Sequence, residues 1–165
     1  MAFDAYLIFD TPPIAGESTS DIHPKSIELK SYDFGITMAA APGRSDGGGA
    51  TTGRANFNEF NCEKNIDLSS PHLAYHCAAG TSLGKVLVKL YLRLGNGKTH
   101  NFLTLTYSDA VITECTIQGS GGDDLPSETL KINYGAVMFE YNQAAPGTKK
   151  NRFDWSQITN TGTQA

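Results

Sequence analysis

The segment KVLVKLYLRLGNGKTHNFLTLTY, residues 85–107, decides the fold because its apolar residues recur with a period of two. One face of its first half is wholly aliphatic: Val86, Val88, Leu90, Leu92 and Leu94. The opposite face is mixed and carries Lys85, Leu87, Lys89, Tyr91 and Arg93. Successive side chains of a strand point to opposite faces, so this pattern predicts a strand with one buried face and one wet or interfacial face. Asn96–Gly97 is a strong hairpin-turn signal, and the partner strand is predicted over His100–Tyr107.

The same period continues in other parts of the chain. Ser108–Asp109 is expected to turn into a third strand over Val111–Ile117, which completes a meander. Two further strand patterns, Ile27–Met38 and Leu130–Tyr141, change phase midway, the second of them at Gly135. Long strands that bend in this way suit curved sheets, so the prediction is a mainly β fold, a closed antiparallel barrel.

One helix is predicted beside the barrel. Ser69 or Ser70 is a suitable N-cap, Pro71 fits the first turn and Gly80 fits the end. Three of its residues are expected to face the barrel: Leu73, Ala74 and Cys77.

The chain of 165 residues is interpreted as a single domain spanning residues 1–165. Residues 39–54 are rich in glycine and poor in core-forming residues, and they are expected to form a long functional or disordered loop. Residues 144–165 are interpreted as a C-terminal tail anchored by Phe153 and Trp155.

Composition excludes several classes of partner. With 13 Lys and Arg against 17 Asp and Glu, the net charge is −4, which argues against binding to nucleic acid. No apolar run approaches the roughly 20 residues needed to span a bilayer, so membrane insertion is not expected. Because Asp4 interrupts the N-terminal apolar stretch and no Lys or Arg precedes it, no cleaved secretory signal is expected either. The cysteines form no C-x-x-C pair and indicate neither a disulfide framework nor a zinc site: Cys62, Cys77 and Cys115.

Three stretches resemble catalytic or metal-binding motifs, but each lacks a feature that the chemistry requires. Residues 80–84 match G-x-S-x-G around Ser82, but a nucleophile elbow needs a strand before the serine and a helix after it, and here that order is reversed. His72 and His76 have the helical spacing of two metal ligands, yet Leu73 stands where a zinc protease needs glutamate. The residues Gly121, Gly122, Asp123 and Asp124 lack the spacing of a calcium loop and are interpreted as a turn with an exposed acidic tip. We therefore expect no catalytic residues, no metal and no cofactor.

Several short segments, in their order along the chain, resemble the haemolysin-coregulated protein (Hcp) family, the tube subunit of bacterial type VI secretion. These segments are Met1–Leu7, Gly16–Ser18, Ile27–Gly35, Gly47–Gly49, Lys64–Asp67, Ser70–Leu73, Gly119–Asp123 and Leu130–Tyr134. Thr11–Pro13 lengthens the first connection relative to the family, and Tyr32 and Phe34 stand where the family often has tryptophan.

The resemblance implies a barrel similar to that of phage tail tubes, with one flanking helix. It further implies a homo-hexameric ring that stacks into a hollow tube, partners a contractile sheath and a tip spike, and carries or chaperones small effectors. The protein would be cytoplasmic before firing and then secreted without an N-terminal signal peptide. The alternative is a secreted β-barrel effector or binding module that acts as a monomer.

The resemblance also assigns roles to particular residues. Ser31 and Asp33 are expected in the lumen, in contact with cargo. The ring-stacking loop would include Gly47, Gly48, Gly49 and Arg54. The mixed face of residues 85–93 is a candidate subunit interface, and a solvated outer face is an equally good interpretation of it.

Overall fold

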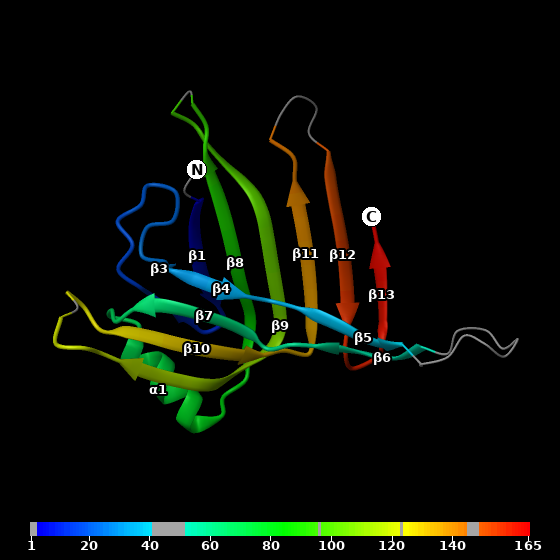
Figure 1. Ribbon diagram of the computed structural model, residues 1–165, viewed down its shortest axis with the longest axis horizontal. Helices are drawn as coiled ribbons and strands as arrows, with labels where there is room; N and C mark the ends of the chain where they lie inside the picture. The colour runs from blue at the N-terminus through cyan, green and yellow to red at the C-terminus, as the bar shows by residue number, and fades with distance from the viewer. Residues whose placement is uncertain (1–2, 41–51, 96, 123, 145–148) are drawn as a thin grey trace, which may run out of the picture.

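The computed structural model describes residues 3–40, 52–95, 97–122, 124–144 and 149–165, which form a mainly β protein with one helix (Figure 1). This confirms the predicted class. The strands are β1 (Phe3–Asp10), β2 (Pro13–Ile14), β3 (Ile27–Glu28), β4 (Ser31–Asp33), β5 (Ile36–Ala40), β6 (Thr52–Phe57), β7 (Phe60–Asn65), β8 (Leu83–Arg93), β9 (Thr99–Gln118), β10 (Ser127–Asn133), β11 (Ala136–Asn142), β12 (Lys150–Ser156) and β13 (Thr161–Gln164). The helix, α1, spans Ser70–Ala79.

The predicted hairpin of residues 85–107 is confirmed as the centre of a large antiparallel sheet, here called the first sheet. β8 pairs with β9 and with β1, and β9 continues through β11 and β12 to β13. The aliphatic face of β8 is buried as expected, because Val86, Val88 and Leu90 are wholly inaccessible. Gly97 closes the hairpin with φ of 75°, a left-handed conformation that costs glycine little.

The expected turn at Ser108–Asp109 is wrong, because β9 runs through it as one 20-residue strand. Asp109 takes a φ of 52°, and from Val111 onward the strand pairs with β10 instead of β8 and β11. The second half of β9, β10, β7 and β4 form the second sheet. A single strand therefore belongs to both sheets, and the second sheet crosses in front of the first (Figure 1).

Two other predicted long strands are interrupted where their pattern changes phase. Leu130–Tyr141 divides at Tyr134–Gly135 into β10 and β11, which pair with different halves of β9. Ile27–Met38 divides into β3, β4 and β5, and this segment passes from β1 of the first sheet to β7 of the second. In both segments the phase change therefore coincides with the point where the chain leaves one sheet and joins the other.

Within the described ranges, the strand pairings do not close into a barrel. The path through both sheets ends at β13 on one side and at β4 on the other, while β5 and β6 pair only with each other. The structure is an open pair of crossed sheets, in which the continuous chain of β3 and β4 bridges one side.

The predicted helix is confirmed with small differences. Pro71 lies in the first turn and Gly80 ends the helix with φ of 61°. Ser69 occupies the N-cap position but its side chain makes no capping hydrogen bond to the helix. Leu73 is buried and Cys77 half-buried, whereas Ala74 is exposed, so only two of the three residues expected to face inward do so.

The predicted C-terminal tail is wrong. Residues 150–164 form β12 and β13, which extend the first sheet. The two expected anchors do pack, with Phe153 stacked on Phe139 and Trp155 stacked on Phe57. Of the expected loop at residues 39–54, both described ends lie in the hairpin of β5 and β6, and residues 41–51 lie outside the described part.

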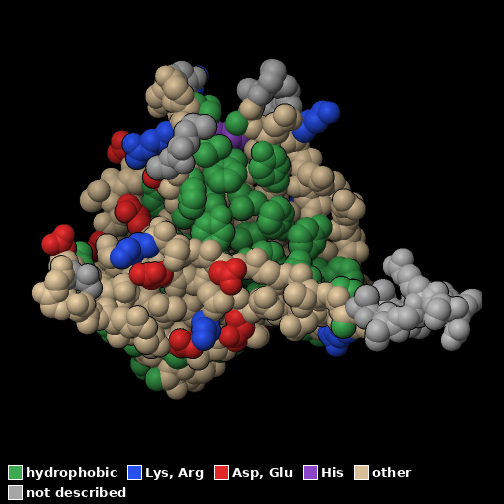
Figure 2. All heavy atoms as spheres, viewed as in Figure 1, with side chains coloured by type: hydrophobic (Ala, Val, Ile, Leu, Met, Phe, Trp, Pro, Cys, Tyr) green, Lys and Arg blue, Asp and Glu red, His purple; other side chains and the backbone are tan. Residues whose placement is uncertain are grey.

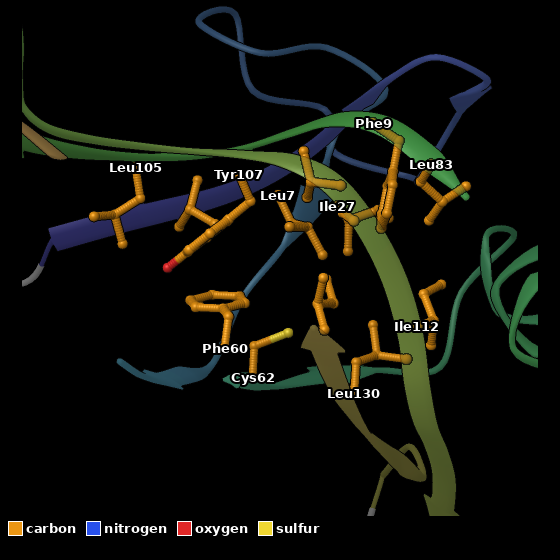
Figure 3. Packing of buried hydrophobic residues seen from close by; sticks show 14 of the residues in the cluster. Leu7, Phe9, Ile27, Phe60, Cys62, Leu83, Leu105, Tyr107, Ile112 and Leu130 are labelled. Carbon is orange, nitrogen blue, oxygen red and sulfur yellow. The ribbon is translucent and has the colours of Figure 1, made fainter. Parts of the chain in front are cut away.

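The core fills the space where the two sheets cross (Figure 3). Leu7, Leu105 and Tyr107 of the first sheet point toward Phe60, Cys62 and Leu130 of the second. At about 25 cal/mol per Å² of apolar surface, this burial is the main stabilising contribution.

A buried polar network joins α1 to the inner face of the second sheet. Lys64 and Glu128 are both fully buried, and the Lys64 ammonium lies 2.8 Å from the Glu128 carboxylate. Lys64 also donates to Asp67 and to Ser70, while Ser70 and Cys115 each donate to Glu128. Burial works to raise the pKa of Glu128, but these donors outweigh it and the pKa is lowered. The network fixes the position of α1, because Ser70 is the first residue of the helix.

Replacing Lys64 with methionine should destabilise the fold by about 3–5 kcal/mol, because it leaves the buried Glu128 carboxylate without its cation. Chemical denaturation at matched protein concentration measures this difference. Lys30→Met is the matched control, since Lys30 forms an exposed pair with Glu63 and its loss should cost about 0–1 kcal/mol. Equal losses for the two variants would contradict this interpretation of the network.

The same network predicts a pH dependence. The folded pKa of Glu128 lies below its ordinary value of 4.5, so its contribution is complete above that pH and declines as the pH falls through the folded pKa. Glu128→Gln should therefore be less stable than the original protein at pH 7, and the difference should shrink below pH 4.5. Unfolding free energies measured from pH 7 down to about pH 3 test this; a constant difference would count against a charged Glu128.

Candidate functional site

The outer face of the second sheet is polar at its paired positions except at Val111, which pairs with Asn133. Ser31 and Asp33 of β4 are both exposed while Tyr32 between them turns inward, as the sequence predicts. Cross-strand pairing places this row beside those of β7, β10 and β9. We call the set the polar face: Ser31, Asp33, Asn61, Glu63, Glu114, Thr116, Thr129 and Lys131.

Charge on the polar face is mixed but negative. It holds three carboxylates and one ammonium, so its net charge is −2. Lys131 and Glu114 form an ion pair, in which their hydrogen bond lowers the pKa of Glu114 and raises that of Lys131. Among the described residues Asp33 has no cationic partner, so its charge is available to a ligand.

The predicted interface residues of β8 share the outer face of the first sheet. Lys85 and Arg93 are exposed, and the three between them are half-buried. Arg93 pairs with Asp4 at 3.1 Å. The structure thus brings all five together on one face, and their role as a subunit interface stays a prediction.

Part of this outer face is already covered by the chain itself. His23, in the loop before β3, lies 2.7 Å from the Tyr91 hydroxyl through its Nε2, and both rings contact Tyr6. Burial and then the charge of Lys89 lower the pKa of His23, so the imidazole is neutral near pH 7. Tyr91 is therefore less available to a partner than the sequence suggests.

The remaining predicted residues lie at the ends of the molecule. Gly47, Gly48 and Gly49 fall outside the described residues. Arg54 lies on β6, where its guanidinium donates to the carbonyl of Gln157. In the acidic turn between β9 and β10, Gly121, Gly122 and Asp124 are exposed, and Asp123 falls outside the described residues.

One surface was missed by sequence reasoning: the upper end of the inner face of the first sheet. Apolar side chains gather there above β4 and β5, over β8, β9, β11 and β12 (Figure 2). Cross-strand pairs put Leu103 beside Tyr141, and Phe139 beside Phe153. We call this set the apolar end: Phe3, Leu92, Leu103, Phe139, Tyr141 and Phe153.

Exposure rises along the β11 side of this face and at its β1 end, whereas Leu90 and Leu105 between them stay buried. The row of Val86, Tyr107 and Val137, under the second sheet, is at most 2% exposed. Two rows further, Tyr141 is 46% exposed, as is Phe3 at the end of β1. The sequence marks all these residues as core, and only the position of the second sheet reveals which of them lack a cover.

The chain matches the family model described as "Type VI secretion system effector, Hcp" over residues 6–141, and it belongs to this family. Its curated relative, Protein hcp1 of Pseudomonas aeruginosa, is 27% identical over 108 residues, which are 62% of this chain and 65% of the relative's length. The match therefore spans just under two-thirds of that protein.

Solved structures agree over nearly the whole chain. One described as a type six secretion system protein is 27% identical, has a TM-score of 0.88 and covers 98% of this chain and 100% of its own. Hcp1 of Salmonella typhimurium is 24% identical with a TM-score of 0.77, covering 99% and 100%, and so supports the fold alone.

These findings assign the chain to type VI secretion. The described part of the chain has no helix long and apolar enough to cross a bilayer. In that same part, His72 and His76 are not joined by other potential ligands in a cluster of three or more.

Proposed function

We propose that this protein is the structural subunit of a type VI secretion inner tube, in which six copies form a ring and the rings stack. The single observation that carries the proposal is the apolar end. Six large apolar side chains left partly uncovered on one sheet are costly for a monomer in water and typical of an assembly surface.

The family and the fold support this role. Membership of the Hcp family connects the chain to a secretion apparatus. A closed ring uses head-to-tail contacts between two different surfaces of each subunit. The unpaired strand edges at β4 and at the second half of β9 are two such surfaces. In the ring, the crossed sheets would act as the barrel that the sequence predicts, since neighbouring copies can cover their edges.

We further propose that the polar face lines the hollow of the ring and that Ser31 and Asp33 contact cargo there. An apolar lining would hold a passing protein tightly, whereas the paired positions on this side of the sheet are polar apart from Val111. Repeated around a ring, its net negative charge would attract basic cargo and repel acidic cargo. The loop containing Gly47–Gly49, the sheath and the tip spike would complete the apparatus.

Purified protein should run as a particle of about six times 17.7 kDa, seen as rings by negative-stain microscopy. Light scattering coupled to size exclusion measures the mass at low and high salt. Because the contacts are proposed to be mainly apolar, the mass should change little with salt. A species of 17.7 kDa at every concentration would overturn the proposal and favour the alternative, a monomeric secreted effector.

Asp33→Lys should weaken retention of a small basic protein, such as cytochrome c, without preventing ring assembly. The reason is that it replaces an unpaired carboxylate on the polar face with a cation. Co-sedimentation of rings with the probe measures retention, and ring mass is measured on the same sample. Asp10→Lys, which makes the same charge change at an exposed position of β1 off this face, is the control. Unchanged retention in intact Asp33→Lys rings would refute the assignment of the lumen.

A further inference from the structure

Each of the two crossed sheets extends beyond the region where they cover each other. The inner face of the second sheet is covered there by α1, which is held by the bonds of Ser70 to Glu128 and Lys64. The corresponding extension of the first sheet is the apolar end, and no described segment of the chain covers it (Figure 2). The layer between the sheets is therefore filled at one end and open at the other.

The exposed surface of α1 is unusual for a helix that faces water. Residues 70–79 contain no Asp, Glu, Lys or Arg. Tyr75 is 67% exposed, and Leu68 just before the helix is 63% exposed. Ile117 of β9 pairs with Glu128, so it shares the face on which α1 packs, and it too is exposed. Apart from His72, the exposed residues of α1 are Pro71, Tyr75 and three alanines, and a helix with so little polar surface favours an element that another segment covers.

These two surfaces adjoin opposite edges of the second sheet. The apolar end lies next to β4, because Phe3 contacts Tyr32 at a ring separation of 6.0 Å. α1 lies next to β9, the strand at the other edge, which is its main packing partner. In Figure 1, α1 lies by the β9 edge of the second sheet, away from its β4 edge. If one copy places its β9 edge against the β4 edge of the next, α1 would lie over the neighbour's apolar end.

We infer that α1 of one copy packs on the apolar end of the adjacent copy, with Tyr75 and Leu68 as its anchors. This inference rests on the proposed ring and names the two surfaces that make it. A second copy is the occupant because neither surface carries Asp, Glu, Lys or Arg and both expose large apolar side chains, and because they lie at opposite edges, as a head-to-tail contact requires. The outer face of β8, with its lysines and arginine, matches α1 poorly.

The contact would give the exposed Tyr75 side chain aromatic partners and would cover the apolar end. Tyr75 is the kind of large, amphipathic side chain that forms the centre of protein interfaces. The apolar end offers it aromatic partners, including the stacked rings of Phe139 and Phe153.

Two substitutions on α1 test the contact. Tyr75→Asp should raise the protein concentration needed for half-assembly on the order of tenfold or more, because it brings a charge into an apolar contact. Tyr75→Phe keeps the aromatic side chain and should assemble like the original protein. Ile158→Asp, at an exposed apolar residue between β12 and β13, is the control for added charge. Thermal unfolding of each variant below its assembly concentration verifies that the monomer is intact.

A photo-crosslinking side chain, p-benzoylphenylalanine at position 75, then identifies what α1 touches. Cross-links to residues 92–103 or 139–153 of another copy are expected. If the original protein forms rings but cross-links fall on the outer face of β8 or on the β5–β6 hairpin, the inference is wrong and the ring proposal stands. Cross-links to a co-purified effector, with no link between copies, would also overturn it. If no rings form at all, the proposed function itself fails.

Discussion

The bend of β9 at Asp109 is the constraint on which the rest of the structure depends. One strand pairs with β8 and β11 along its first half and with β10 along its second, so the two sheets cannot lie parallel. Crossed sheets cover each other only where they overlap, and each must extend past the other. Within the described part of the chain, α1 covers one extension and the other stays open, and we propose the core-like side chains exposed there as the surface for assembly.

The two layers differ in chemistry because their faces have different neighbours. The inner side holds the aliphatic and aromatic core together with the buried pair of Lys64 and Glu128, whose five-residue network fixes α1. The outer side of the second sheet is polar at its paired positions apart from Val111, and it is negatively charged. This division suits the proposed tube wall, in which the apolar inner layer would join the copies and the polar surface would face the cargo.

Much of the fold could be predicted from periodicity, because strands paired by local turns leave a clear pattern. The hairpin of residues 85–107, the boundaries of the helix at Pro71 and Gly80, and the outward direction of Ser31 and Asp33 are examples. The wrong predictions concern segments whose structure is decided by pairing with strands far away in the sequence. Asp109 looks like a turn residue but bends a continuous strand, and residues 150–164 carry too weak a local pattern to reveal that they pair with β11 and with each other.

Only part of the candidate site could be predicted from the sequence pattern. Leu103, Phe139 and Tyr141 have the alternation of core residues, and nothing local distinguishes a covered core residue from an uncovered one. The absence of charge in residues 70–79 is the one signal that could have pointed to the assembly surface, since a solvated helix usually carries charge on one face.

Hydroxyl-radical footprinting of the aromatic side chains tests most directly whether another copy completes the inner layer. Tyr141 and Phe139 should be oxidised readily in dilute, dissociated protein and become protected as rings form, while Ile158 stays equally reactive throughout. Tyr141 and Phe139 that react as fast in assembled rings as in the monomer would contradict the structure-based assignment of this face to the subunit contact.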